Sequence, residues 1–191
     1  MANVNHSTLT DPYLHEPKGV AAAAVGEVYM ADGAGSGDWV SLKPHIGGYV
    51  TFDSSTPAYT LATGGTSDVV ITPTFVGTHA DNFTAQTSPN ARFRYDGTPD
   101  VHAFVTFNCS MKQSSGGTID VELVLYKNGV SQEGSRVVRS ATNGAWGSVA
   151  LSFDLILSTN DYLEFFLKTP GGAATVLFAH AYARVQASAE I

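Results

Sequence analysis

Apolar and polar residues alternate along most of the chain from about Tyr49 onward, and a period of two predicts β-strands. The clearest run is 101–111, where every second residue is apolar and the positions between are mainly polar. The same pattern extends over 49–52, 68–71, 91–95, 118–127, 136–140, 149–157, 162–168 and 175–186. We find no long amphipathic helical pattern, so the body is expected to contain eight or more strands.

Turn signals separate these runs. Asn128-Gly129 is a pair favoured by type I′ hairpin turns and is the strongest local prediction. Thr63-Gly64-Gly65-Thr66 and Pro170-Gly171-Gly172 mark further turns. Short strands joined by tight turns, without crossover helices, predict an all-β fold, an antiparallel jelly-roll sandwich.

Residues 1–47 differ in kind from the body, residues 48–191. They contain Asp11-Pro12, Glu16-Pro17 and the glycine-rich run 33–37, with isolated apolar anchors between them. Such a stretch cannot form a core alone, and it is typical of an extended segment that folds against another surface. We therefore expect an extended N-terminal docking arm followed by one jelly-roll domain.

Composition and charge limit the classes of partner that the chain can bind. Hydrophobic residues make up 43% and charged residues 14%, which indicates a folded globular chain. The formal net charge of −7, without a basic stripe, excludes nucleic acid as a partner because such affinity comes mostly from Lys and Arg. No stretch approaches the roughly 18 apolar residues of a membrane helix, and the N-terminus lacks the features of a signal peptide. We expect that the protein does not associate with a membrane. We also expect that it assembles in a cytoplasm.

Four features of the body occur in a recognisable order. The run Tyr49-Val50-Thr51-Phe52 opens it, Phe93-Arg94-Tyr95-Asp96-Gly97 precedes the long strand, and the segment 121–129 ends in Tyr126-Lys127-Asn128-Gly129. The segment 158–164 follows, with Asn160 before Asp161. This order resembles the jelly roll shared by tumour necrosis factor and the globular heads of complement-type collagenous proteins. That family usually has a Leu-x-x-Gly-Asp turn at the place of 158–164, so Asn160 stands in place of its glycine. The resemblance implies a homotrimer.

The N-terminal segments 12–20 and 26–39 resemble, in wording and order, a piece that recurs in tailed-phage head fibres, decoration proteins and tail fibres. In those proteins the piece lies near the end that attaches to the particle. The resemblance implies a virion-docking role for a set of anchors: Tyr13, Leu14, His15, Pro17, Tyr29 and Trp39. The receiving partner would be the phage major capsid protein or another virion structural protein.

Large aromatic and histidine side chains fall on the polar faces of several expected strands, where they would form an adhesive patch unless buried between subunits. The expected trimer-interface residues are His102, Phe104, Phe166, Phe178, His180 and Tyr182. An alternative is that the strand faces are reversed and the aromatic residues belong to the core. His102 and His180 could meet and give pH sensitivity, or they could be ordinary interface or surface histidines.

Residues that could support catalysis are not arranged for it. Gly33-Ala34-Gly35-Ser36-Gly37 lacks the Lys-Ser/Thr of a phosphate loop, and no Gly-x-Ser-x-Gly elbow occurs. The six histidines show no metal-ligand spacing, and Cys109 is expected to be a small buried hydrophobe. We expect no enzyme activity, no cofactor and no metal.

The leading hypothesis is a trimeric capsid decoration or head-fibre protein on the virion surface. The alternative is a tail-fibre or receptor-binding module that binds a host-surface glycan, with Tyr59, Trp146 and Tyr162 stacking on sugars. A secreted cytokine-like ligand suits the jelly roll but not the N-terminal segment or the absence of a signal peptide.

Overall fold

The computed structural model describes residues 23–24, 27–31, 37–41, 46–53, 59–63, 65, 67–71, 76–86, 92–98 and 100–189. The chain divides into two compact units between Pro44 and His45. In the first unit, β1 (Glu27–Ala31) and β2 (Gly37–Ser41) form an antiparallel hairpin. The segment expected to be extended therefore contains a two-stranded sheet of its own.

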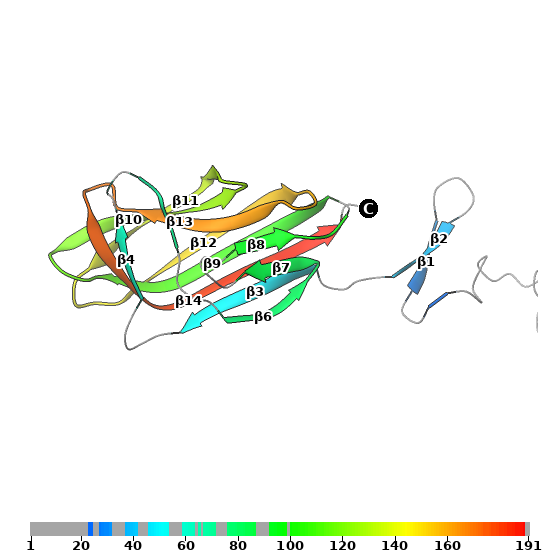
Figure 1. The fold of residues 1–191 in the computed structure, drawn as a ribbon, viewed down its shortest axis with the longest axis horizontal. Helices are drawn as coiled ribbons and strands as arrows, with labels where there is room; N and C mark the ends of the chain where they lie inside the picture. The colour runs from blue at the N-terminus through cyan, green and yellow to red at the C-terminus, as the bar shows by residue number, and fades with distance from the viewer. Residues whose placement is uncertain are drawn as a thin grey trace, which may run out of the picture. The chain divides into compact units, whose positions relative to one another are not determined.

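The second unit is an antiparallel sandwich of two sheets, shown in Figure 1. Its strands are β3 (Ile46–Asp53), β4 (Tyr59–Thr63), β5 (Val69–Val70), β6 (Val76–Asp81), β7 (Phe83–Gln86), β8 (Arg92–Tyr95), β9 (Val101–Gln113), β10 (Thr118–Lys127), β11 (Val130–Thr142), β12 (Gly147–Leu157), β13 (Tyr162–Lys168) and β14 (Ala174–Ala189). The β10 sheet has the order β11-β10-β13-β8-β7, with β5 beside β13. The β9 sheet has the order β12-β9-β14-β3-β6, with β4 beside β14.

Each sheet therefore pairs strands that are distant in the sequence. In one sheet β9 lies between β12 and β14, and in the other β10 lies between β11 and β13. This is the arrangement of a jelly roll. The described residues contain strands and turns and no helix, and so none that could span a membrane. The expected all-β jelly-roll class is confirmed.

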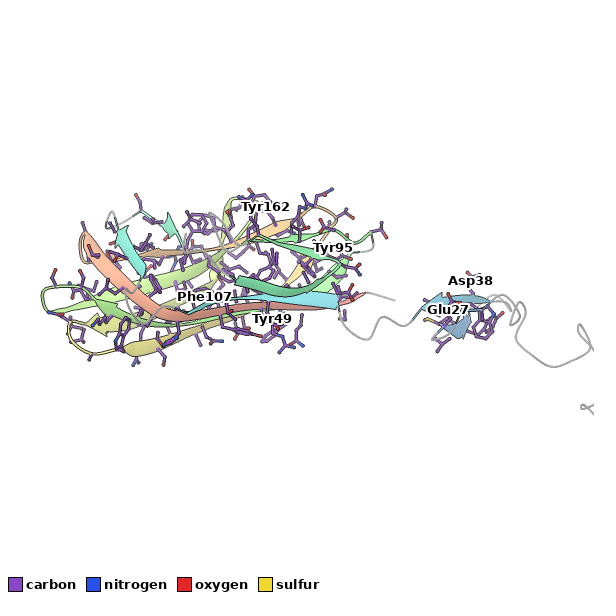
Figure 2. The ribbon with its side chains drawn as sticks, turned by 60° about the horizontal axis from the view of Figure 1, so that its bottom comes forward. Glu27, Asp38, Tyr49, Tyr95, Phe107 and Tyr162 are labelled. Atoms are coloured by element: carbon purple, nitrogen blue, oxygen red, sulfur yellow. The ribbon has the colours of Figure 1, made fainter. Side chains whose placement is uncertain are left out.

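The core lies between the two sheets because each long strand turns its apolar side inward. Along β9 the residues at odd numbers from Val101 to Gln113 are buried, and those at even numbers are exposed or half-buried. Phe107 of β9 stacks on Phe165 of β13 with ring centroids 4.6 Å apart, which joins the two sheets (Figure 2). Such an aromatic pair contributes about 0.5 to 1.5 kcal/mol beyond the burial of its area.

Left-handed backbone at three positions closes two neighbouring turns. Asn128 and Gly129 have φ of 52° and 76°, the positive values that a type I′ turn requires. Asn160 has φ of 70°, so it adopts the conformation expected of the glycine that it replaces. The side-chain amide of Asn128 donates a hydrogen bond of 2.6 Å to the carboxylate of Asp161, and Lys127 pairs with the same carboxylate at 2.7 Å. The two turns therefore lock together at one end of the sandwich.

Candidate functional site

The outer face of the β10 sheet carries a network of ion pairs centred on Arg136. Its guanidinium contacts Asp68 at 3.1 Å, Glu122 at 3.2 Å and Glu133 at 2.8 Å. Lys168 shares Glu122 at 3.2 Å, and Tyr126 donates a hydrogen bond of 2.7 Å to Asp68. Because Asp68 precedes β5, the network fastens the short β5 segment to the main sheet.

The network shifts the titration of its members. Burial opposes ionisation of Asp68, but hydrogen bonds from Arg136 and Tyr126 outweigh it and lower the pKa. Hydrogen bonds from Arg136 and Ser131 lower the pKa of Glu133 to about 2. Burial, followed by the hydrogen bond to Asp68, raises the pKa of Tyr126 to about 12. These groups therefore keep fixed protonation states around neutral pH, as structural groups do, and none is set up as an acid or base.

A second contact on the same sheet joins β8 and β13. Arg92 forms a fork of two hydrogen bonds with Glu164, at 3.2 and 2.8 Å, and stacks over the ring of Tyr162 at 4.4 Å. Phe166 stacks on Tyr126 with centroids 3.9 Å apart. Arg92, Tyr126, Arg136 and Phe166 on the β10 sheet therefore make their charged and aromatic contacts within the chain.

The outer face of the β9 sheet is different. It exposes a row of small residues on β12, with Phe104 42% exposed on β9 and Ile156 46% exposed on β12. Tyr182 of β14 packs on Tyr49 of β3 with centroids 5.9 Å apart. Among the side chains that the structure describes, every ion pair belongs to the β10 sheet or its turns. The face is therefore mixed in polarity and not stabilised by ion pairs between described side chains.

Two shallow hollows lie on this face. One lies where the start of β9 pairs with the end of β14. Its lining residues are His102, Phe104, Asp154, Gln186, Ala187 and Ser188. The other lies farther along the same strands and is lined by Asn108, Cys109, Ser110, Ser148, His180, Ala181 and Tyr182. Both hollows are wide and open, which fits contact with a protein surface better than enclosure of a small molecule.

The structure places His102, Phe104, His180 and Tyr182 of the expected interface set together on this face. Phe178 was wrongly assigned to it, because Phe178 is fully buried in the core. The register of β14 against β9 shifts between Phe178 and His180, which leaves Ala179 as an extra residue. Such a bulge reverses the alternation, so Phe178 and His180 point to opposite faces.

Phe166 is also misplaced in the expected set, because it lies on β13 in the β10 sheet and not in the β9 sheet. The simple assignment failed because sheet membership depends on pairing between distant strands. The two histidines do not meet within the chain. His102 pairs with Ser188 and His180 with Ser110, a separation of roughly 26 Å along β9 at about 3.3 Å per residue. Each histidine already makes an interaction within the chain.

The docking residues divide into two groups. Tyr13, Leu14, His15 and Pro17 lie outside the described residues. Tyr29 and Trp39 face each other across β1 and β2, with rings 5.5 Å apart in an edge-to-face arrangement.

Gly37 is required for the packing of this hairpin. A Cβ at Gly37 would lie 2.1 Å from the Met30 carbonyl oxygen and 2.9 Å from the Tyr29 ring. Val28 and Val40 are exposed on the other face of the hairpin, and Figure 2 labels its acidic residues Glu27 and Asp38. A two-stranded hairpin alone is marginally stable in water, so β1 and β2 need contacts beyond their own pairing.

Groups that could carry chemistry are not gathered together. The described residues contain no cluster of three His, Cys, Asp or Glu side chains that could hold a metal. Burial raises the pKa of the Cys109 thiol to about 12, so Cys109 behaves as the buried hydrophobe expected from the sequence.

The end of the sandwich that holds the turns 113–118 and 142–147 carries an exposed aromatic group. Trp146 is 44% exposed, and the Lys112 ammonium lies 4.7 Å from its ring centroid. Trp146 was a candidate from the sequence, whereas Lys112 was missed. The strand pattern contained its signal, because Gly147 pairs with Met111 and residue 146 therefore follows beside residue 112.

The topology defines the class of protein as an antiparallel jelly roll. Two solved structures are similar in fold. Eiger TNF from S. frugiperda matches with a TM-score of 0.46 and 12% identity over 77% of this chain and 94% of that chain. The PRD1 vertex protein P5 matches with a TM-score of 0.46 and 12% identity over 75% of this chain and 96% of that chain. No protein-family model and no curated protein matches the sequence.

Proposed function

We propose that this chain is a non-enzymatic phage virion structural protein, a trimeric capsid decoration or head-fibre protein that docks on the head through its N-terminal segment. The observation that carries the proposal is the contrast between the two outer faces of the sandwich. On the β10 sheet, Arg136 and its neighbours form a network of ion pairs, whereas the β9 sheet exposes Phe104 and Ile156 on a face without ion pairs between described side chains. A face with exposed apolar groups and no ion pairs between its described side chains favours burial against further copies of the chain.

The hairpin of β1 and β2 supplies the docking element in this proposal. Its paired Tyr29 and Trp39, with Val28 and Val40 on the opposite face, offer apolar surface on both sides. A trimer presents three such hairpins, so contacts that are individually modest act together at high effective concentration. Assembly would take place in the host cytoplasm, and the mature location would be the capsid surface.

Cryo-electron microscopy of the virus that encodes this chain tests the location. The proposal expects threefold density over the head, with the N-terminal segment against the shell. Density confined to the tail would contradict the head location and favour a receptor-binding role instead.

Cosedimentation with shells that lack the protein tests the docking mechanism. Gly37→Ala should abolish binding because the added Cβ collides with the Met30 carbonyl. Gly171→Ala is the matched control, since a Cβ there meets nothing within 4 Å. A monomeric variant that still bound shells at full strength would overturn the role of avidity.

The alternative is a receptor-binding module that binds a host glycan, and the exposed Trp146 is the observation that favours it. The same virion map distinguishes the two, because receptor binding at a tail tip and decoration of a shell predict density in different places.

A further inference from the structure

We propose that the end of the sandwich around Trp146 binds an acidic glycan, with the indole stacking on a sugar ring and Lys112 and Arg139 holding its negatively charged group. The site would act in solution whether the chain decorates a head or a tail, so it does not depend on the proposed location. It adds a ligand-binding activity to a structural protein.

The first step of the argument is the placement of the aromatic ring. Trp146 lies in the turn between β11 and β12, and together with Phe104 it is one of two aromatic side chains exposed among the described residues. Phe104 lies on the outer face of the β9 sheet, but Trp146 lies at the end of the strands, among short turns. An exposed indole presents an apolar ring that suits the C–H face of a sugar, and its N–H can reach a hydroxyl group.

The second step concerns the two cations beside the ring. Lys112 lies over Trp146 at 4.7 Å. A Cβ built at Gly147 would lie 3.9 Å from Arg139 Nε, so this guanidinium lies beside the residue that follows Trp146. Neither Lys112 nor Arg139 has a carboxylate partner among the described side chains, whereas Arg92, Lys127, Arg136 and Lys168 all do. These two cations therefore remain available to an external anion.

The third step is the charge distribution. The chain carries a formal net charge of −7, yet the two turns at this end, 113–118 and 142–147, contain no Asp or Glu, and the nearby carboxylate of Asp120 accepts a hydrogen bond of 2.7 Å from Ser140. These turns join β9 to β10 and β11 to β12 at the left end of the sandwich in Figure 1. Lys112 and Arg139 therefore lie beside turns without carboxylates, which favours an anion there.

The position of the Trp146 turn within the sandwich is consistent with ligand binding there. β3 begins opposite the end of β14, since Ile46 pairs with Ala187, whereas the Trp146 turn lies near the beginning of β14. The sandwich therefore begins at the end away from Trp146.

Tryptophan fluorescence of the full chain tests the proposal, because only Trp39 and Trp146 contribute. In a Trp39→Phe background the signal reports on Trp146 alone. Titration with a trimer of galacturonic acid should give a saturable change, and a neutral galactose trimer should bind at least about tenfold more weakly, as a lost ionic contact predicts. Galactose 6-phosphate distinguishes a phosphate from a carboxylate as the preferred group.

Variants connect binding to the named residues. Measured by calorimetry, Trp146→Ala and Lys112→Gln should each weaken binding by about tenfold, as expected for loss of stacking or of a charged hydrogen bond. Arg94→Gln, an exposed arginine at the other end of the β10 sheet, is the matched control and should change affinity by less than about twofold.

Three results would overturn the site: no binding of either acidic probe at millimolar concentration, equal weakening by Arg94→Gln, or a change in oligomeric state on Trp146→Ala without any change in glycan affinity. Shell binding is measured separately. Failure of the glycan site and failure of the decoration role are therefore distinguishable.

Discussion

The two outer faces of the sandwich differ in how their exposed side chains interact. On the β10 sheet, Arg136 gathers three carboxylates, and Arg92 and Lys168 pair with neighbouring strands. On the β9 sheet, Phe104 and Ile156 are exposed beside His102, Asp154 and Gln186, and ion pairs between described side chains do not occur. The comparison teaches that a face closed by its own charges is suited to solvent, whereas the other face is suited to a partner.

Phe104→Arg should have the largest effect, because it places a charge at the centre of the proposed subunit contact. We expect the dissociation constant of the oligomer to rise by about 100-fold or more, which corresponds to about 2.7 kcal/mol. Stability of the separated chain should change by less than about 0.5 kcal/mol, since the side chain is already exposed. Analytical ultracentrifugation measures the first effect and chemical denaturation the second. An unchanged oligomer would remove the assigned role of this face.

Arg136→Met should have the next largest effect, and it should act on folding alone. The substitution removes the cation that Asp68, Glu122 and Glu133 share. The Arg136 side chain is only 15% exposed, so water replaces it poorly. We expect a loss of about 2 to 3 kcal/mol in the free energy of unfolding, measured by urea denaturation. The oligomeric state should not change. Dissociation of the oligomer by this variant would show that the two faces are not independent.

Acidification should weaken the same network by a smaller amount. The pKa of Asp68 is lower in the folded chain than in the unfolded chain, so its contribution is present above about pH 4. It is lost as pH falls through the folded pKa. Asp68→Asn should therefore flatten the decline of stability between about pH 5 and pH 2, as followed by denaturation at each pH. A decline as steep as in the wild type would place the acid sensitivity elsewhere.

Arg94→Gln should have the smallest effect. Arg94 pairs with Asp96 at 2.7 Å, but its side chain is 51% exposed, so water screens the interaction. We expect a change of less than about 0.5 kcal/mol in the free energy of unfolding. Thermal unfolding of Arg94→Gln beside Arg136→Met would then separate a surface ion pair from the partly buried network. Similar losses in both variants would contradict this distinction.

Local chemistry allowed much of the fold to be predicted. Alternation identified β9, β10, β12, β13 and β14, and Asn128-Gly129 marked a turn whose two positive φ values the structure confirms. Buried positions follow from that alternation because successive side chains of a strand point to opposite faces.

The candidate site was predicted less completely, because it depends on pairing between distant strands. Alternation alone placed Phe178 beside His180, and nothing in the local pattern marked the extra residue between them. The composition of β13 likewise did not reveal that Phe166 belongs to the opposite sheet from Phe104. Sequence position gives a face relative to neighbouring residues, whereas sheet membership is a property of the whole topology.

The bulge in β14 also makes strand length a determinant of the surface. Deletion of Ala179 would make Phe178 and His180 direct neighbours, and because they already point to opposite faces, the strand would become regular with the same side chains inside. Deletion of a regularly paired residue such as Ala183 would instead turn the side chains beyond it to the opposite face. The tolerance of β14 to shortening therefore depends on position: the bulge can lose a residue without exchanging its two surfaces, whereas the regular part of the strand cannot.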